Sequence, residues 1–371
     1  MQGQNSARRI PDETPAMSRD YSQLFGDAPK AEPLSPLGAL GWQAFFWAQT
    51  DVDEMAATPP VRVCEVHRNG AHVVGDGIDA MIPAGGHAAT VGDWMLFNAE
   101  IPKDSRLLDR KSLIKRKAAG SDRQVQMIAA NIDTAFVVTS CNQDFNIARL
   151  ERFIALAFDA GVTPVLVLTK LDLCDDPSDY VEQARGISEL VDVVVLDARG
   201  GEPREKLARW CKPGQTVAFM GTSGVGKSTL TNALAGTDEI ETKAIREIDA
   251  RGRHTTTRRQ LYFLASGCVV MDTPGMRELQ LSDAAAGVGE VFEDIEELAT
   301  NCKFNDCSHT VEPSCAIRAA VEAGDLDASR LARWQKLVNE DAANSATMAQ
   351  RKVKDKVLGK TIKAIQKHKK K

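Results

Sequence analysis

The sequence predicts a multidomain protein in which a small all-β barrel precedes an α/β domain and a small helical module follows it. Three observations predict this order. Short β-prone runs separated by turn signals lie between residues 61 and 101, and continuous apolar strands alternate with amphipathic helices from residue 133 to about 285. Strands then give way to helices around three clustered cysteines. With 371 residues and 43% apolar content, two to four packed domains are expected.

The N-terminal part is expected to divide into an extension and the barrel. Residues 1–57 are rich in Pro, Ser, Asp and Gln, and only residues 37–49, with four aromatic side chains, are able to pack. We therefore expect a largely disordered extension with one short helix. The barrel is expected at 58–112, with strands at residues 61–67, 71–74, 78–83 and 94–100. Residues 107–124 are basic and polar, which is typical of a linker.

The α/β domain is expected at residues 113–285, because apolar strands that alternate with helices are typical of a parallel sheet. Its strands are expected at residues 133–140, 164–170, 191–197, 216–220 and 268–271. Residues 286–371 should form the helical module and a tail, and a helix near residue 335 should bury one face made of Leu331, Trp334, Leu337 and Val338.

A phosphate-binding loop is predicted directly after the strand at 216–220. The pattern G-x-x-x-x-G-K-S opens a helix, and a strand, a loop and a helix in this order are the context that the motif requires. Backbone N–H groups would surround phosphate oxygens, Lys227 would reach the β- and γ-phosphates, and Ser228 would hold Mg²⁺. A glycine-rich turn with a solvated lysine is the alternative. The expected contacts are Gly221, Thr222, Ser223, Gly224, Val225, Gly226, Lys227, Ser228 and Thr229.

Two further segments are expected to complete the phosphate site. Asp272 ends an apolar strand, so its carboxylate can face Mg²⁺ through water while Gly275 approaches the γ-phosphate, although a simple turn is the alternative. Between these segments, residues 252–257 contain three adjacent threonines, in a stretch that is either a mobile loop lending a hydroxyl to Mg²⁺ or an edge strand. The residues alone do not select among the three threonines.

A guanine-binding segment is predicted upstream of the phosphate loop. Asp172 follows the strand at 164–170 and can accept hydrogen bonds from both N1–H and N2–H of guanine, a pair that adenine does not offer. Thr169 and Lys170 belong to the same T-K-x-D pattern, and Asp197 with Ala198 forms a possible second base-contacting loop. An ATP-dependent kinase or ATPase, in which this pattern is incidental, is the alternative.

The order of these motifs is a circular permutation of the usual one, in which the phosphate loop comes first. A permuted domain is physically permissible because domain termini tend to lie close together at the surface. The barrel, the permuted order, the sequence GRHTTT and the cysteine-rich module together resemble the RsgA family of ribosome small-subunit-dependent GTPases, over residues 58–340. The resemblance implies an OB-fold barrel, a permuted GTPase domain and a zinc domain that bind the 30S subunit. It also implies GTP hydrolysis stimulated by that subunit during its late maturation.

The resemblance further implies a catalytic group. It makes Thr256 the switch threonine, which together with Ser228 and Asp272 would form the magnesium set, while Lys227 neutralises the transferring phosphate. A hydrophobic residue replaces the usual water-orienting glutamine in that family, and here it is Met276. His254 is then the nearest candidate for orienting water, although it can equally contact RNA or face solvent. We expect slow hydrolysis by the isolated protein.

The C-terminal part predicts a metal site and an RNA contact. Cys302, Cys307, His309 and Cys315 match one structural Cys₃His zinc site, with a redox pair or buried thiols as the alternative. Residues 346–371 hold ten basic residues and one acid, a net +9 in a chain of net charge −5, so this tail is either solvated or contacts rRNA phosphates.

The partners and compartment follow from the same features. We expect GTP, GDP and the 30S subunit with its rRNA as partners. No run approaches the roughly 20 apolar residues needed to cross a bilayer, so we expect no membrane partner and a cytoplasmic monomer. An RNA-binding nucleotide switch without significant turnover is the alternative function.

Overall fold

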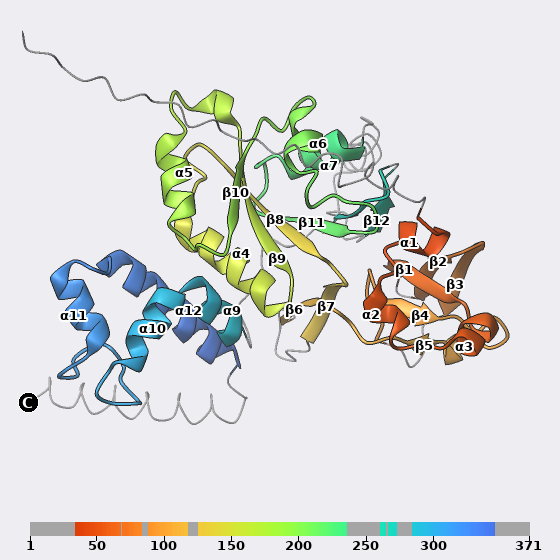
Figure 1. Ribbon diagram of the computed structural model, residues 1–371, viewed down its shortest axis with the longest axis horizontal. Coiled ribbons are helices and arrows are strands. Elements are labelled where there is room, and N and C mark those ends of the chain that lie inside the picture. Colours follow the sequence, from red (N-terminus) through yellow and green to blue (C-terminus); the bar gives the residue numbers. More distant parts are fainter. Residues whose placement is uncertain are drawn as a thin grey trace, which may run out of the picture. The chain divides into compact units, whose positions relative to one another are not determined.

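The computed structural model describes residues 34–67, 69–83, 88–117, 125–235, 260–264, 266–272 and 284–345 (Figure 1). The predictions for the extension before residue 34, for the loop with three threonines, for Gly275 and for the tail after residue 345 lie outside the described residues. Within the described ranges, no helix is both long and apolar enough to cross a membrane.

The α/β domain is built on parallel strands, as the apolar runs predicted. These strands occur in the order β10-β9-β8-β11-β13, and every neighbouring pair among them is parallel. Because the five strands are parallel, their carboxyl ends lie at the same edge of the sheet. The phosphate and base motifs directly follow their strands at this edge. The bounds are β8 Thr134–Ser140, β9 Thr163–Thr169, β10 Asp192–Val195, β11 Thr216–Met220 and β13 Val269–Asp272.

Helices cover both faces of this sheet because successive strand side chains point to opposite faces. Val137 packs with α4 and α5 in one apolar cluster, whereas the adjacent Phe136 packs with α6 and α7 in the other. Figure 1 shows α6 beside α7. Both faces are therefore closed to water, which explains the uninterrupted apolar strands. The helices are α4 Ile147–Asp159, α5 Ser178–Arg185, α6 Glu202–Lys206 and α7 Lys227–Ala235.

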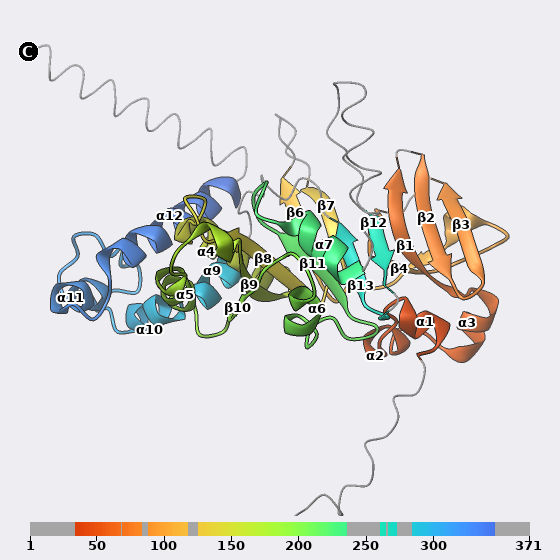
Figure 2. The same ribbon diagram turned by 90° about the horizontal axis from the view of Figure 1, so that it is seen from above.

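The same sheet continues into the barrel through β12 (Gln260–Phe263), which the sequence did not reveal. This strand pairs antiparallel with β13 and also with β1, where Glu65 lies opposite Gln260 (Figure 2). The barrel strands are antiparallel, and their side chains enclose a separate apolar core. They are β1 Pro60–His67, β2 Gly70–Gly75, β3 Ile78–Pro83, β4 Trp94–Leu96 and β5 Arg106–Leu107, with the short 3₁₀ helix η1 at Pro102–Asp104.

Two sequence predictions near the barrel need correction. Residues 34–57 form three short helices where the sequence suggested one, because Trp42 and Phe46 pack against the buried Trp94 of the barrel. The stretch 107–124 is not only a linker, because part of it forms a strand: β6 (Leu113–Lys117) is antiparallel to β7 (Val125–Ala130). The three helices are α1 Pro36–Ala39, α2 Ala44–Trp47 and α3 Val52–Ala57.

Arg62 of β1 joins the N-terminal helices, the barrel and the α/β domain. Its buried guanidinium donates hydrogen bonds to the Leu40 carbonyl, to the Asn131 carbonyl at 3.3 Å and to Thr216 Oγ1 at 2.8 Å. Burial lowers the pKa of Arg62 to about 10, which still leaves it charged at neutral pH. A buried charge must be hydrogen-bonded, so Arg62 holds these three segments to one another.

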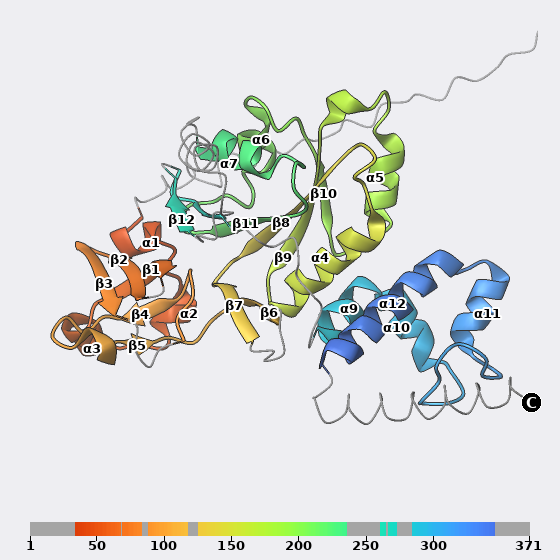
Figure 3. The same ribbon diagram turned by 180° about the vertical axis from the view of Figure 1, so that it is seen from behind.

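The helical module packs on the α4 side of the sheet, and α9 lies against α4 (Figure 3). Trp334 and Leu337 are buried as predicted and Leu331 packs against the same core, but Val338 is 38% exposed, so its assignment to the buried face was wrong. The buried stripe of α12 continues through Asp341 instead, whose carboxylate accepts a hydrogen bond from Ala284 N–H. The module contains α9 Ala285–Val291, α10 Glu293–Thr300, α11 Ala316–Ala323 and α12 Ala328–Ser345.

Candidate nucleotide and metal sites

The phosphate loop lies between β11 and α7, and its first glycine is sterically required. Gly221 has a φ of +140°, and a Cβ atom there would lie 2.3 Å from the Val138 carbonyl oxygen. Only glycine allows the chain to leave β11 so close to β8. Ser223, Gly224 and Ser228 are exposed, so the open side of the loop, at the N-terminus of α7, is accessible to an anion.

Lys227 curls back over this loop. Its Nζ donates hydrogen bonds to the carbonyl oxygens of Gly221, at 2.9 Å, and Thr222, at 2.5 Å. The ammonium group is therefore held beside the concave backbone that the sequence assigned to phosphate. Ser228 and Thr229 occupy the first turn of α7, where N–H groups have no partner within the helix.

The base segment and the phosphate loop are joined by one hydroxyl group. Thr169 is fully buried at the end of β9, and its Oγ1 lies 2.7 Å from the Val225 carbonyl oxygen and 3.1 Å from that of Thr139. A Cβ placed on Gly226 would lie 3.6 Å from Thr169 Oγ1 and 3.7 Å from the Cβ of Ala198. The phosphate loop, the T-K-x-D segment and the loop after β10 therefore meet at one place.

Asp172 lies just beyond this junction, in the 3₁₀ helix η2 (Leu171–Leu173). Lys170 precedes it with a φ of +56°, a left-handed conformation that is uncommon for a residue with a side chain. The Asp172 side chain is 48% exposed, and its Oδ2 lies 2.9 Å from Arg199 Nη2. Sequence reasoning missed Arg199, although a guanidinium two residues after Asp197 was a visible signal.

Arg199 also contacts Asp197 in the loop after β10. Asp197 Oδ1 accepts a hydrogen bond from the Arg199 N–H at 3.0 Å and lies 3.3 Å from Arg199 Nε. The hydrogen bond with Asp197 and the charge of Asp172 raise the pKa of Arg199, and the Arg199 N–H in turn lowers the pKa of Asp197. Both shifts favour the charged forms of Arg199 and Asp197.

For Asp272, another predicted magnesium ligand, the structure describes the position of the backbone. Asp272 is the last residue of β13, which is parallel to β11, so its Cα lies at the edge of the sheet from which the phosphate loop emerges. His254, Thr256, Gly275 and Met276 lie outside the described residues.

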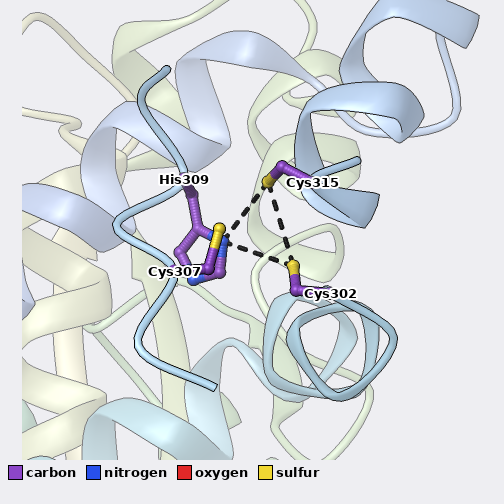
Figure 4. Close-up of side chains that lie close together, drawn as sticks. All are labelled: Cys302, Cys307, His309 and Cys315. Carbon is purple, nitrogen blue, oxygen red and sulfur yellow. Dashed lines mark hydrogen bonds between the residues drawn. The ribbon is translucent and has the colours of Figure 1, made fainter. Parts of the chain in front are cut away.

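Four side chains that could hold a metal ion converge in the helical module (Figure 4). Cys302, Cys307, His309 and Cys315 each offer one donor atom, and these atoms all lie within 4.8 Å of one another. The Cys302 and Cys315 sulfurs are 3.9 Å apart, and both lie 3.5–3.6 Å from His309 Nδ1. Tetrahedral zinc with Zn–S bonds of about 2.3 Å separates two sulfurs by about 3.8 Å, so the four residues fit this ion.

The loop that carries these ligands is braced by Glu312. Its carboxylate accepts hydrogen bonds from the N–H groups of Ser308 at 2.9 Å and of Thr310 and Val311 at 3.1 Å. These bonds hold the turn in which His309 adopts a φ of +58°. The centre of the His309 ring also lies 5.6 Å from that of the Trp334 ring of α12, so the four side chains contact the core of the module.

Comparisons with known proteins agree with this arrangement. The family model "RsgA GTPase" matches residues 107–282. The chain is 46% identical over 343 residues to the small ribosomal subunit biogenesis GTPase RsgA 2 of Vibrio parahaemolyticus, covering 91% of this chain and 94% of that protein. It is 48% identical over 318 residues to RsgA of Mesorhizobium japonicum, covering 83% and 91%. The chain belongs to the RsgA GTPase family.

Solved structures extend the comparison to the fold of this RsgA-family chain. The crystal structure of YjeQ from Thermotoga maritima matches with a TM-score of 0.55 and 25% identity, over 76% of this chain and 97% of that one. YloQ, described as a circularly permuted GTPase, matches with a TM-score of 0.53 and 26% identity, over 78% and 97%. The prediction of a permuted GTPase fold is confirmed, and the RsgA-family chain is a GTPase.

Proposed function

We propose that this GTPase reads guanine with Asp172, holds the phosphates with the 221–228 loop and acts in maturation of the small ribosomal subunit. The observation that carries the proposal is the 2.7 Å contact between Thr169 Oγ1 and the Val225 carbonyl oxygen. It supports the proposal because the segment assigned to the base then adjoins the loop assigned to the phosphates. Family membership favours GTP over ATP as the substrate.

The chemistry follows from where each group lies. Lys227 and the loop amides neutralise the negative charge of the γ-phosphoryl group that is transferred to water. They do so efficiently because donors that are already fixed in place need no reorganisation during the reaction. Mg²⁺, which GTPases bind with GTP, would neutralise the β- and γ-phosphate oxygens, and Ser228, Thr256 and Asp272 are the residues assigned to hold it. His254 is the proposed group that orients water, since Met276 has no polar atom suited to this task.

The small ribosomal subunit is the proposed partner and stimulator. The relatives from Vibrio and Mesorhizobium are named for biogenesis of that subunit, and the net +9 of residues 346–371 suits rRNA phosphates. The Cys₃His cluster would hold a structural zinc, because four protein ligands leave no open position for catalysis. Subunit maturation would place the protein in the cytoplasm, as a monomer without a membrane partner.

The test measures the GTPase rate against added 30S subunits for the wild type, Ser228→Ala and Ser178→Ala. We expect slow hydrolysis alone, strong stimulation by the subunit, and loss of stimulated turnover in Ser228→Ala. Ser178→Ala is the matched control. Ser178 also lies in the first turn of a helix, but that helix is α5, which does not follow the phosphate loop. Turnover that is equal with and without subunits, or equal in Ser228→Ala, would refute the proposal.

A further inference from the structure

Arg199 connects the two segments that are proposed to contact guanine. It belongs to the loop after β10, and its Nη2 lies 2.9 Å from Oδ2 of Asp172 in η2. The same guanidinium lies 3.3 Å from Asp197 Oδ1 through its Nε. Among the described residues, Arg199 is the cation that the structure pairs with Asp172.

The backbone around Arg199 fixes the direction of its side chain. Asp197 Oδ1 accepts the Arg199 N–H at 3.0 Å, which is the local turn that aspartate favours. The Asp197 N–H in turn donates to Glu202 Oε2 at 3.0 Å, and Lys206 pairs with the same carboxylate at 2.8 Å. These contacts connect α6 to the backbone of Arg199. The turn that carries the Arg199 side chain is therefore held in place by hydrogen bonds.

Guanine recognition needs a carboxylate whose plane is fixed. Two parallel donors, N1–H and N2–H, must each meet one oxygen of Asp172, and a side chain that is 48% exposed is free to rotate unless it is held. Each carboxylate oxygen has two lone pairs, so Oδ2 can accept from Arg199 and from the base together. A guanidinium is suited to this task because its donors are planar and always charged.

We propose that Arg199 is a positioning residue for guanine specificity, which holds the Asp172 carboxylate in the plane of the base and couples it to the loop of Asp197 and Ala198. The proposal rests on the assignment of Asp172 to guanine in the proposed function. Arg199 acts through Asp172 and takes no part in the transfer of phosphate.

A purely structural role accounts poorly for this ion pair. Exposed ion pairs contribute little to the stability of a fold, and the Arg199 side chain is 64% exposed. The domain offers a matched control, because Arg209 pairs with Asp192 at the same 2.9 Å and with the same exposed fractions of 64% and 48%. That pair lies at the start of β10, the end of the strand opposite to the Asp197 loop.

The experiment measures dissociation constants of GDP, IDP and ADP for the full-length wild type, Arg199→Ala, Arg199→Lys and Arg209→Ala. IDP lacks the 2-amino group of guanine and so makes only one of the two bonds with Asp172. We expect Arg199→Ala to weaken GDP about tenfold and IDP much less, since a ligand with one bond depends less on the carboxylate plane. Arg199→Lys should recover part of the affinity, and Arg209→Ala should bind all three nucleotides like the wild type.

Two further measurements separate positioning from a change in folding or chemistry. In an Asp172→Ala background, Arg199→Ala should cause no additional loss of GDP affinity, because the carboxylate that it positions is gone. The melting temperature of Arg199→Ala and its turnover number at saturating GTP with 30S subunits should match the wild type. A KM effect without a kcat effect is the signature of binding rather than catalysis.

The outcomes are distinguishable. GDP affinity that is unchanged or tighter in Arg199→Ala would overturn the positioning role, and so would an equal loss for GDP and IDP or an undiminished loss in the Asp172→Ala background. A wild type that binds ADP as tightly as GDP would instead refute the guanine site of the proposed function, and the role of Arg199 would fall with it.

Discussion

A buried hydroxyl group, that of Thr169, holds the base segment against the phosphate loop. Its Oγ1 carries one hydrogen and lies nearer to the Val225 carbonyl, at 2.7 Å, than to the Thr139 carbonyl, at 3.1 Å. Val225 is itself buried, so its carbonyl cannot turn to water if the hydroxyl is removed. The shape of the phosphate loop therefore depends on a residue more than 50 positions earlier in the chain.

We predict that Thr169→Val raises the KM for GTP about tenfold, because an unpaired buried carbonyl costs about 1–3 kcal/mol and the loop relaxes to avoid it. Valine matches threonine in shape, so packing is kept and the lost hydrogen bond dominates the effect. Steady-state kinetics with 30S subunits provide the measurement. Thr163→Val is the control, since Thr163 begins the same strand in an exposed position. Equal KM values in the two variants would contradict the prediction.

At the scale of elements, the connection between α10 and α11 has few apolar contacts to hold it. Phe304 and Val311 in this connection are 40% and 81% exposed, so apolar burial does little to fix the loop. The hydrogen bonds to Glu312 brace it, and it carries four convergent side chains that could hold a metal ion. Without a metal, three thiols and an imidazole would have little reason to remain within 4.8 Å of one another.

We predict one zinc per chain and local unfolding of the loop when zinc is removed. Elemental analysis should give unit stoichiometry for the wild type, and Cys302→Ser should lower it, because a structural site needs all four ligands. Hydrogen exchange in residues 302–315 should accelerate after chelation, while exchange in β8, β9 and β11 stays slow. Cys174→Ser is the control, as Cys174 lies in the α/β domain. Unchanged exchange of the loop without zinc would rule out this role for the metal.

The parallel strands could be predicted because both faces of their sheet are buried. An uninterrupted apolar run such as β9 is rarely compatible with any other environment. The short strand β12 escaped prediction because its pairing with β1 joins segments that are distant in sequence. The strand β6 was assigned to a linker because three of its five residues are basic, although it pairs with β7, the next strand along the chain. Val338 was misplaced because helical periodicity fixes a stripe of residues but not the width of the buried face.

The nucleotide site stays a prediction, and the sequence suggests its parts unequally. Local motifs such as residues 221–228 carry their chemistry in consecutive positions, so spacing alone points to them. The partnership of Arg199 with Asp172 escaped because it joins residues 27 positions apart, on loops brought together only by the sheet. Spacing cannot reveal which surface charges meet in this way.

At the scale of the whole molecule, a buried ion pair attaches the helical module to the α/β domain. Glu151 of α4 is fully buried, and Arg333 of α12 lies 2.9 Å and 3.0 Å from its two oxygens, with Arg330 at 3.9 Å. Arg330 also pairs with Asp294 and donates a hydrogen bond to the Ile187 carbonyl. Burial raises the pKa of Glu151, and the two guanidinium groups oppose that shift.

Removing Glu151 would leave two arginines beside an apolar helix face without their shared anion. Breaking a buried pair by deleting one partner costs about 3–5 kcal/mol, since the remaining charge stays desolvated. The raised pKa also sets a pH dependence. Glu151 binds its proton more tightly in the folded state than in the unfolded state, so protonation of Glu151 stabilises the folded state at acid pH. This stabilisation is lost as the pH rises through the pKa of Glu151 in the folded state.

We predict that Glu151→Ala lowers the free energy of unfolding by about 3 kcal/mol and loosens the module from α4. Basal GTP hydrolysis should persist because the phosphate and base loops lie on other elements, whereas stimulation by 30S subunits should fall if the module helps to bind them.

Glu151→Gln, which keeps one acceptor oxygen, should lose less of both. Glu322→Ala, which removes an exposed partner of Arg318 within the module, should behave like the wild type. Denaturant titrations and subunit-stimulated rates measure the two effects, and full stimulation in a destabilised Glu151→Ala would show that attachment of the module to α4 is not needed for the response to the subunit.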